Sequence, residues 1–277
     1  MKLLHLLALG AITLLGCAEE ETPVPAETPL PFAFSDGFES ANNDLDDLFP
    51  ADGSRWSNLQ RESPGAEENT ITLDDVIRSE GQRALKLTAA PSGATVSKMN
   101  IEKAGFFAPV GSLVEIRGDF YISSAGNLEN LFLIDLECCS CWDPGVPNNQ
   151  CPGVRLKLSD PQGYPSIERG KILGRTLSHT GFPFPKDEWV RVVWRMRLSP
   201  NGEGENVLEI NDRVVLDTRG KNLPNADEFR AEFAANDINF TLGDPLGYER
   251  IQIGATANSS NDAVGVWVDD FSLTIEE

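Results

Sequence analysis

The sequence is poor in positive charge. It contains 23 Lys and Arg residues against 43 Asp and Glu residues, which gives a formal net charge of −20 over 277 residues. A strongly acidic chain is repelled by phosphate backbones and by anionic lipid headgroups. The composition therefore predicts no nucleic-acid partner and no electrostatic attachment to a membrane.

Several catalytic signatures are also absent. The sequence has no glycine-rich loop suited to cradling phosphates and no GxSxG motif of a serine hydrolase. Histidine occurs only twice, and His5 lies within an apolar N-terminal run. His179 is then the one histidine left for acid–base chemistry, and a Ser/His/Asp triad is not supported.

Long apolar runs are lacking beyond the N-terminus. Residues 3–15 are too short for a membrane span, which needs about 20 apolar residues, but fit the apolar region of a signal peptide. The run ends in LLGC, which resembles the bacterial lipobox and implies a diacylglycerol on Cys17. We predict a lipoprotein signal peptide over residues 1–17 and a Pro/Glu-rich tether over residues 18–32. Because Ala18 rather than Asp follows the cysteine, we expect an exported protein anchored by lipid alone to the cell envelope, at the outer membrane.

Four further cysteines lie within fourteen residues: Cys138, Cys139, Cys141 and Cys151. In an oxidising compartment such a local, even set predicts two disulfides. The pairing is either 138–141 with 139–151, or 138–151 with 139–141, and a four-thiolate zinc site is the alternative. In each case the cysteines tie down one loop, residues 137–153, which also carries Trp142.

Apolar and polar residues alternate with a period of two in most of the chain. Turn-forming residues bound these segments, which is the pattern of half-buried strands. The pattern predicts strands at residues 69–77, 83–88, 95–101, 114–122, 130–137, 154–159, 190–198, 207–210, 214–217, 250–255 and 265–275. Only residues 226–235 suggest a helical turn or two. We therefore predict an all-β protein, a two-sheet antiparallel β-sandwich or jelly roll, with a single domain over residues 33–277.

Six segments, taken in order, resemble the concanavalin A-like lectin/glucanase jelly rolls, and especially bacterial members close to the heparin-lyase and glucuronan-lyase groups. These segments are residues 34–39 (FSDGFE), 79–87 (SEGQRALKL), 187–194 (DEWVRVVW), 207–215 (VLEINDRVV), 251–254 (IQIG) and 266–273 (VWVDDFSL). The resemblance implies a structural Ca²⁺ held by Glu39, Asp270 and a carbonyl near Gly81, since calcium prefers carboxylate and carbonyl oxygens. Solvated acids at adjacent strand ends are the alternative.

Five basic residues alternate with apolar residues on the predicted strands: Lys98, Arg155, Lys157, Arg195 and Arg197. Each therefore points away from the core. If they share the concave sheet, they form a cationic floor for an acidic polysaccharide, because arginine matches a carboxylate or sulfate with two donors. Charges scattered over several faces are the alternative.

Other side chains could complete a sugar-binding groove. Asp135 and Glu137 share one strand face and could bind sugar hydroxyls or anchor the cysteine loop. Trp142, Phe182 and Phe184 could stack on sugar rings, although the two phenylalanines could equally cap the core.

The strand at residues 131–137 also resembles the ExDxE strand of laminarinase-like hydrolases, but Leu133 replaces its first carboxylate. The Gln-x-His pair of the lyase relatives is absent. A divergent lyase would use Arg195 to neutralise a uronate carboxylate, with His179 or Tyr164 as base and proton donor.

The leading prediction is a cell-envelope lipoprotein that binds polysaccharide on a concave sheet without catalysis, and we expect that polysaccharide to be acidic. A divergent polysaccharide lyase that cleaves uronate-containing glycans by β-elimination is the first alternative. A structural or assembly lipoprotein with a protein partner is the second, and it predicts a large exposed apolar patch.

Overall fold

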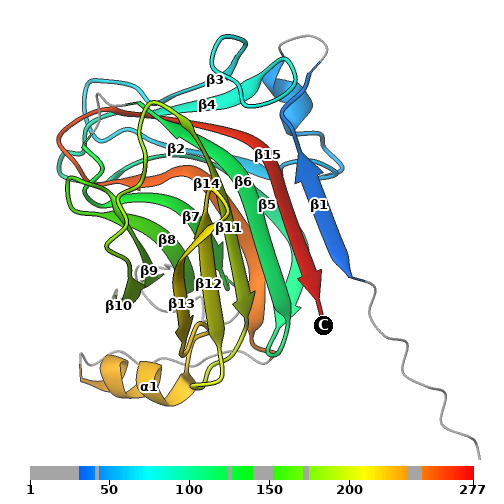
Figure 1. The fold of residues 1–277 in the computed structure, drawn as a ribbon, viewed down its shortest axis with the longest axis vertical. Helices are drawn as coiled ribbons and strands as arrows, with labels where there is room; N and C mark the ends of the chain where they lie inside the picture. Colours follow the sequence, from blue (N-terminus) through cyan, green and yellow to red (C-terminus); the bar gives the residue numbers. More distant parts are fainter. Residues whose placement is uncertain (1–30, 41–43, 124–126, 140–151, 171–174, 236–244) are drawn as a thin grey trace, which may run out of the picture.

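The computed structural model describes residues 31–40, 44–123, 127–139, 152–170, 175–235 and 245–277. Within these residues the chain forms fifteen strands, a short 3-10 helix η1 (Leu45–Leu48) and one α-helix, α1 (Ala226–Ala234). The strands build two antiparallel sheets that pack against each other (Figure 1). The predicted leader, Cys17 and most of the tether lie outside the described residues.

Sheet A contains eight strands. Seven follow one another in space, and β1 (Phe32–Asp36) pairs with β15 beside this path. The spatial order is β13 (Arg213–Arg219), β12 (Glu205–Ile210), β11 (Trp189–Arg197), β6 (Leu113–Ile122), β15 (Val264–Glu276), β4 (Ala84–Ala89) and β3 (Thr70–Asp74).

Sheet B contains seven strands. The spatial order is β10 (Arg175–His179), β9 (Tyr164–Gly170), β8 (Gly153–Ser159), β7 (Leu131–Glu137), β14 (Gly247–Asn258), β5 (Ser97–Pro109) and β2 (Asn58–Glu62). β7 and β14, far apart in sequence, therefore meet at the centre of the sheet, where residues of the predicted groove lie.

The core lies between the sheets and is built from the apolar half of each alternating strand. Val190, Val192 and Trp194 of β11 face Leu156 and Ile253 of sheet B within one continuous buried cluster. Burial of this alternating face is the main force that fixes which residues point outward. The predicted all-β, two-sheet antiparallel sandwich is confirmed.

The alternation did not predict four of the strands: β1, β2, β9 and β10. Of these, β1 overlaps the segment 34–39 on which the family resemblance rests. The sequence pattern predicts no strand at residues 175–182, but Arg175–His179 is the outermost strand of sheet B, with a bulge between Thr176 and Ser178. His179 therefore lies on a strand, opposite Ser166 of β9.

The chain leaves β1 through a turn anchored by a buried carboxylate. Asp36 accepts hydrogen bonds from Arg55 Nη2 at 2.7 Å, Trp56 Nε1 at 2.9 Å and the Phe38 backbone N–H at 2.8 Å. Phe38 has a positive φ of 57° and stacks on Trp56. This anchored turn places Glu39 against the loop that precedes β4.

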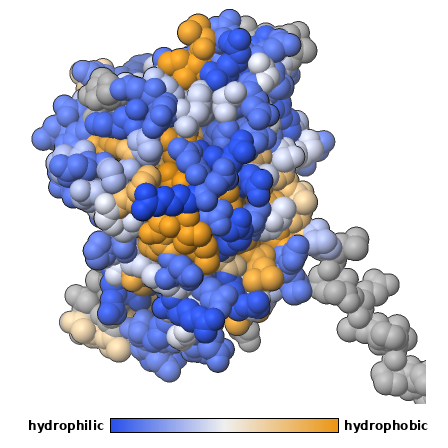
Figure 2. All heavy atoms as spheres, in the orientation of Figure 1, coloured by the Kyte–Doolittle hydropathy of each residue, from blue (hydrophilic) through white to orange (hydrophobic). Residues whose placement is uncertain are grey.

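The described surface is mostly hydrophilic, with smaller hydrophobic patches on the face shown in Figure 2. The large apolar side chains exposed among the described residues are Val76, Val96, Val110, Leu113 and Val214. Val110 and Leu113 lie together at the turn between β5 and β6, and the other three lie on separate segments. None of the described helices is long and apolar enough to cross a bilayer.

Candidate functional site

A row of polar residues crosses the whole of sheet B on the face turned away from the core. Residues directly opposite on neighbouring antiparallel strands project from the same face, so the strand registers define the row. Its members, from β2 to β10, are Asn58, Glu102, Gln252, Asp135, Arg155, Glu168 and Thr176. We call it the polar row.

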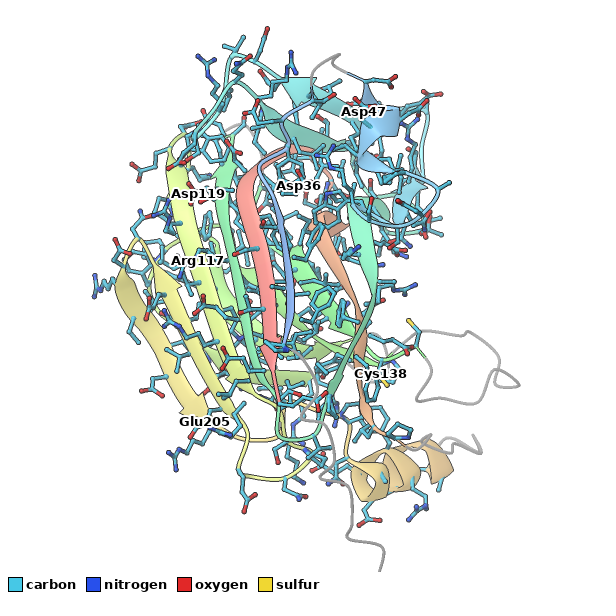
Figure 3. The ribbon with its side chains drawn as sticks, turned by 90° about the vertical axis from the view of Figure 1, so that its right-hand side faces the viewer. Asp36, Asp47, Arg117, Asp119, Cys138 and Glu205 are labelled. Carbon is cyan, nitrogen blue, oxygen red and sulfur yellow. The ribbon has the colours of Figure 1, made fainter. Side chains whose placement is uncertain are left out.

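The central members of the polar row are buried although they face away from the core, whereas Asn58 and Thr176 at its two ends are exposed. Gln252 is 1% exposed, Asp135 2% and Glu102 6%. On the outer face of sheet A the Arg117 and Arg195 side chains are both 42% exposed, although Val193, opposite Arg117, is 4% exposed. Figure 3 labels Arg117 on this sheet. A sheet face whose centre is recessed and whose two edges are exposed has the pattern expected of the inner side of a curved sheet, and we call this outer face of sheet B the concave face.

A second row lies beside the first on the same face. It joins Phe132 of β7, Lys157 of β8, Ser166 of β9 and His179 of β10. The Phe132 ring is 6% exposed and lies beneath two cations, with the Arg155 Cζ 4.3 Å and the Lys157 Nζ 5.4 Å from its centroid. The aromatic ring thereby fixes the height of both cations above the sheet.

The cations of the concave face are paired with carboxylates. Glu168 accepts from Arg155 Nη2 at 2.8 Å and from Lys157 Nζ at 3.1 Å. Arg250 Nε donates to Glu137 at 2.7 Å, and its Nη1 lies 3.8 Å from Glu102. Because buried charges require partners, the predicted cationic floor is instead a layer of alternating charge.

Amide side chains extend this layer toward β2. Asn58 Nδ2 donates to Glu102 Oε2 at 3.0 Å, and Gln252 donates to the other oxygen of the same carboxylate. Asn100 donates to Gln60 Oε1 at 2.9 Å, while its own Oδ1 is buried without a hydrogen-bond partner among the described residues. A ligand hydroxyl above this amide would satisfy it.

The sequence pattern did not reveal on which sheet each basic residue lies. Lys98, Arg155 and Lys157 lie on the concave face, and Lys98 pairs with Glu62 at 3.0 Å. Arg195 and Arg197 belong to β11 and lie on the outer face of sheet A. There Arg195 contacts Glu115 at 2.7 Å and Glu209 at 2.6 Å, and Arg197 lies 3.9 Å from Glu205. The prediction that these two arginines share the groove is wrong.

The structure divides the predicted catalytic set. Tyr164 of β9 and His179 of the edge strand β10 both lie on the concave face. His179 is opposite Ser166, and Tyr164 is two residues before Ser166 on the same side of β9. Arg195, on the opposite sheet, cannot join them. On this face Lys157 of β8 lies directly opposite Ser166 and is the cation nearest to them in the strand register.

The aromatic and cysteine predictions have mixed outcomes. Phe184 is 3% exposed and belongs to the core, and Phe182 is half-buried beneath Arg213. Trp142, Cys141 and Cys151 lie outside the described residues. Cys138 and Cys139 each take part in a disulfide. Cys138 is buried just after the end of β7 (Figure 3). Which cysteines pair with each other stays a prediction.

The three segments of the predicted calcium site meet. Glu39 Oε1 accepts from the backbone N–H of Gln82 at 2.6 Å and lies so close to Gly81 that a Cβ there would be 2.0 Å away. The carboxylate that contacts the same loop from β15 is Asp269, which accepts from the Ser79 N–H at 2.9 Å. Asp270, the predicted ligand, has a side chain 52% exposed and lies 4.0 Å from Arg191.

The chemistry of Asp269 suits a nearby cation. It is 2% exposed, and burial, with a smaller contribution from Asp119, raises its pKa above the usual range. Among the described residues no three His, Cys, Asp or Glu side chains are grouped to hold a metal. A calcium ion here would thus depend on backbone carbonyls as well as Glu39 and Asp269.

Comparisons with known proteins give a fold. No protein-family model matches the sequence, and no curated protein matches it. Among solved structures, an endo-β-1,4-glucuronan lyase from the fungus Trichoderma reesei superposes with a TM-score of 0.56 at 13% identity, over 79% of this chain and 90% of the lyase. The chain has the concanavalin A-like β-sandwich fold.

Two more structures agree with this assignment. The cellulose-induced protein Cip1 has a TM-score of 0.53 at 16% identity, over 87% of this chain and 96% of its own. The alginate lyase Aly36B has a TM-score of 0.51 at 12% identity, over 90% of this chain and 98% of its own. At these identities the similarity shows the fold, and the function has to be argued from the concave face.

Proposed function

We propose that this protein binds a polysaccharide along the concave face of sheet B. The observation that carries the proposal is the polar row, seven polar residues on seven adjacent strands. Carboxylates and amides of this row can accept and donate hydrogen bonds to sugar hydroxyls, and their mutual contacts hold them in place before a ligand arrives.

We infer further that the preferred polysaccharide is acidic. Arg155 and Lys157 converge on one acid, Glu168, so these three side chains carry one net positive charge, whereas Asp135, Glu102 and Glu137 make the neighbouring part of the face acidic. Names of two similar structures refer to glucuronan and alginate, which supports the same ligand class. If Cys17 is lipidated as the sequence predicts, the Pro/Glu-rich tether would present this face at the cell envelope.

Affinity electrophoresis through gels containing single polysaccharides tests the binding proposal. Retardation by glucuronan or alginate, and weaker retardation by a neutral glucan, is the expected result. Equal mobility in every gel of a broad panel would contradict it.

A second candidate function is a polysaccharide lyase, because Tyr164, His179 and Lys157 share one end of the concave face. β-Elimination needs a cation to neutralise the uronate carboxylate, a base for the C5 proton and an acid for the leaving oxygen. Lys157 takes the role that the sequence analysis gave to Arg195. The scattered exposed apolar residues give no comparable support to an assembly role.

Ultraviolet absorbance separates binder from lyase, since elimination creates a conjugated unsaturated uronate. If the protein is a lyase, absorbance rises during incubation with a polyuronate, and either Tyr164→Phe or His179→Ala lowers the rate at least about 100-fold. The same two variants would keep their affinity for the polymer. A flat signal with wild-type protein across a panel of polyuronates would leave the binder as the function.

We propose that the convergence of Glu39, Asp269 and the Gly81 loop holds a structural Ca²⁺. A ligand that binds only the native state stabilises it by about 2.7 kcal/mol at 100 times its Kd. We therefore expect chelation to lower Tm by about 5–10 °C for a domain of this size.

Matched variants make the calcium test specific. Glu39→Gln should abolish the difference in Tm between calcium and chelator, whereas Asp46→Asn, which changes an exposed acid of η1, should leave it intact. An identical Tm for wild-type protein with calcium and with chelator would rule the ion out.

A further inference from the structure

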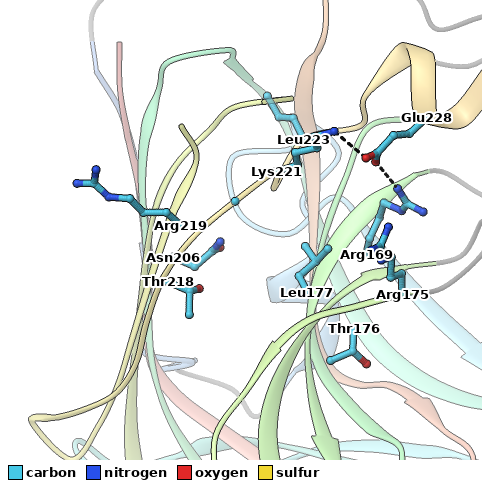
Figure 4. Close-up of a pocket in the computed structure, with 11 residues that line it drawn as sticks. Arg169, Arg175, Thr176, Leu177, Asn206, Thr218, Arg219, Lys221, Leu223 and Glu228 are labelled. Carbon is cyan, nitrogen blue, oxygen red and sulfur yellow. Dashed lines mark hydrogen bonds and ion pairs between the residues drawn. The ribbon is translucent and has the colours of Figure 1, made fainter. Parts of the chain in front are cut away.

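A separate pocket lies at the open edge of the sandwich. Its volume is about 300 Å³, and it lies between β10, the outermost strand of sheet B, and β13, the outermost strand of sheet A, with α1 beside it (Figure 4). Arg175 is opposite Arg169, which is opposite the core residue Val154. These arginines thus project from the inner face of sheet B, and the pocket shares only the edge residue Thr176 with the polar row.

The pocket concentrates positive charge in an acidic protein. Arg169, Arg175 and Lys221 line it, and Glu228 of α1 is the one carboxylate among the described lining residues. Glu228 accepts from Lys221 Nζ at 2.6 Å and from Arg169 Nη1 at 3.2 Å. Lys221, then Arg169 and Arg175, hold the pKa of Glu228 below its usual range, so it stays ionised and balances one of three positive charges.

Two cations differ in how firmly they are held. The Arg169 side chain is 9% exposed, and its guanidinium lies 4.8 Å from the centroid of the Phe229 ring. Arg175 is exposed and forms no ion pair among the described residues. Arg219, although part of the rim, points away from the pocket (Figure 4) and pairs with Glu205 at 2.9 Å. Arg175 is therefore the cation available to a ligand.

The pocket also holds a buried acceptor. Asn206 of β12 is 3% exposed, and its Oδ1 has no hydrogen-bond partner among the described residues. Leaving a buried acceptor unsatisfied is costly, and a hydroxyl group is the donor that fits beside it. Thr218 adds polar lining.

We propose that this pocket binds a small hydroxylated carboxylate, of the size and chemistry of a single uronic acid. The carboxylate is held by the excess positive charge of Arg175 and its neighbours, and a hydroxyl donates to Asn206. A volume of about 300 Å³ lies at the small end of the range for ligand pockets, which suits one sugar ring rather than a chain. The site is independent of glycan binding on the concave face.

Calorimetric titration with D-glucuronate tests the pocket, with D-glucose and sulfate as comparison ligands. We expect glucuronate to bind, glucose to give no heat and sulfate to bind more weakly. Arg175→Ala should weaken glucuronate at least about tenfold, the effect of losing one charge-assisted hydrogen bond. Arg219→Ala removes the same charge from the rim and should change affinity less than about twofold.

Asn206→Ala supplies the second variant. It should weaken glucuronate while leaving sulfate unchanged, because sulfate offers no hydroxyl. If sulfate binds as tightly as glucuronate, the pocket is a general anion site and the proposal is overturned. Equal effects of Arg175→Ala and Arg219→Ala would also overturn it, and so would a titration with glucuronate that gives no heat. Retention of polysaccharide by Arg175→Ala would show that such a failure concerns this pocket and not the concave face.

Discussion

Replacing Glu168 with alanine is expected to lower the free energy of unfolding by about 3–5 kcal/mol. Glu168 bridges Arg155 and Lys157 on the concave face, where the three side chains are only 10%, 13% and 17% exposed. The replacement leaves two cations largely desolvated, side by side and without their shared acid. Breaking a buried ion pair by removing one partner costs this much because the remaining charge has lost its solvation.

An exposed ion pair of the same chemistry provides the control. Glu115 pairs with Arg195 on the outer face of sheet A, where their side chains are 32% and 42% exposed. Glu115→Ala should cost less than about 1 kcal/mol because water replaces the lost partner. Urea unfolding of both variants measures the difference, and similar losses would show that the concave face is as well hydrated as the convex one.

The sequence predicts which residues point away from the core but not the sheet to which they belong. Arg155 and Arg195 alternate with apolar neighbours in the same way, and both point outward as expected. They lie on opposite sheets because the pairing of β8 with β7, and of β11 with β6, is set by contacts distant in sequence. Alternation is a local property, whereas sheet membership is not.

The sequence analysis did not identify Glu102 and Gln252 as members of the site, again because alternation carries only local information. Gln252 lies between the core residues Ile251 and Ile253, and Glu102 follows the core residue Ile101. Alternation could therefore have marked both as outward-facing. What could not be read locally is that they are opposite each other on adjacent strands. β10 was missed because its five residues, RTLSH, are mostly exposed and contain a bulge.

Asp269 contacts the Gly81 loop in place of the predicted Asp270 because the backbone of β15 is irregular at these two residues. The register between β15 and β6 shifts between Asp269 and Ser272, and Asp270 has a positive φ of 43°. A bulge of this kind re-aims side chains that simple alternation would assign to one face. Asp269 thereby contacts the Gly81 loop, and Asp270 turns toward Arg191.

Lys157→Ala is expected to weaken polyuronate binding at least about tenfold. A charge-assisted hydrogen bond to a ligand carboxylate contributes about 1.5–3 kcal/mol, which corresponds to about a tenfold to hundredfold change in Kd. The fold should tolerate the replacement, because Glu168 keeps its 2.8 Å contact with Arg155. The lost affinity would then report on ligand contact.

Arg195→Ala is the matched control for this variant. Arg195 is also a cation on a strand, paired with acids and alternating with core residues, but it lies on the opposite sheet. Its removal changes the net charge by the same amount. Any general electrostatic effect on an anionic polymer would therefore appear equally in both variants.

The most direct measurement is the Kd of a defined polyuronate oligosaccharide for wild-type protein, Lys157→Ala and Arg195→Ala, determined side by side at one ionic strength. Binding on the concave face predicts a Kd at least about tenfold higher for Lys157→Ala and within about twofold of wild type for Arg195→Ala. Equal losses, or a larger loss for Arg195→Ala, would contradict the assignment of the ligand to sheet B.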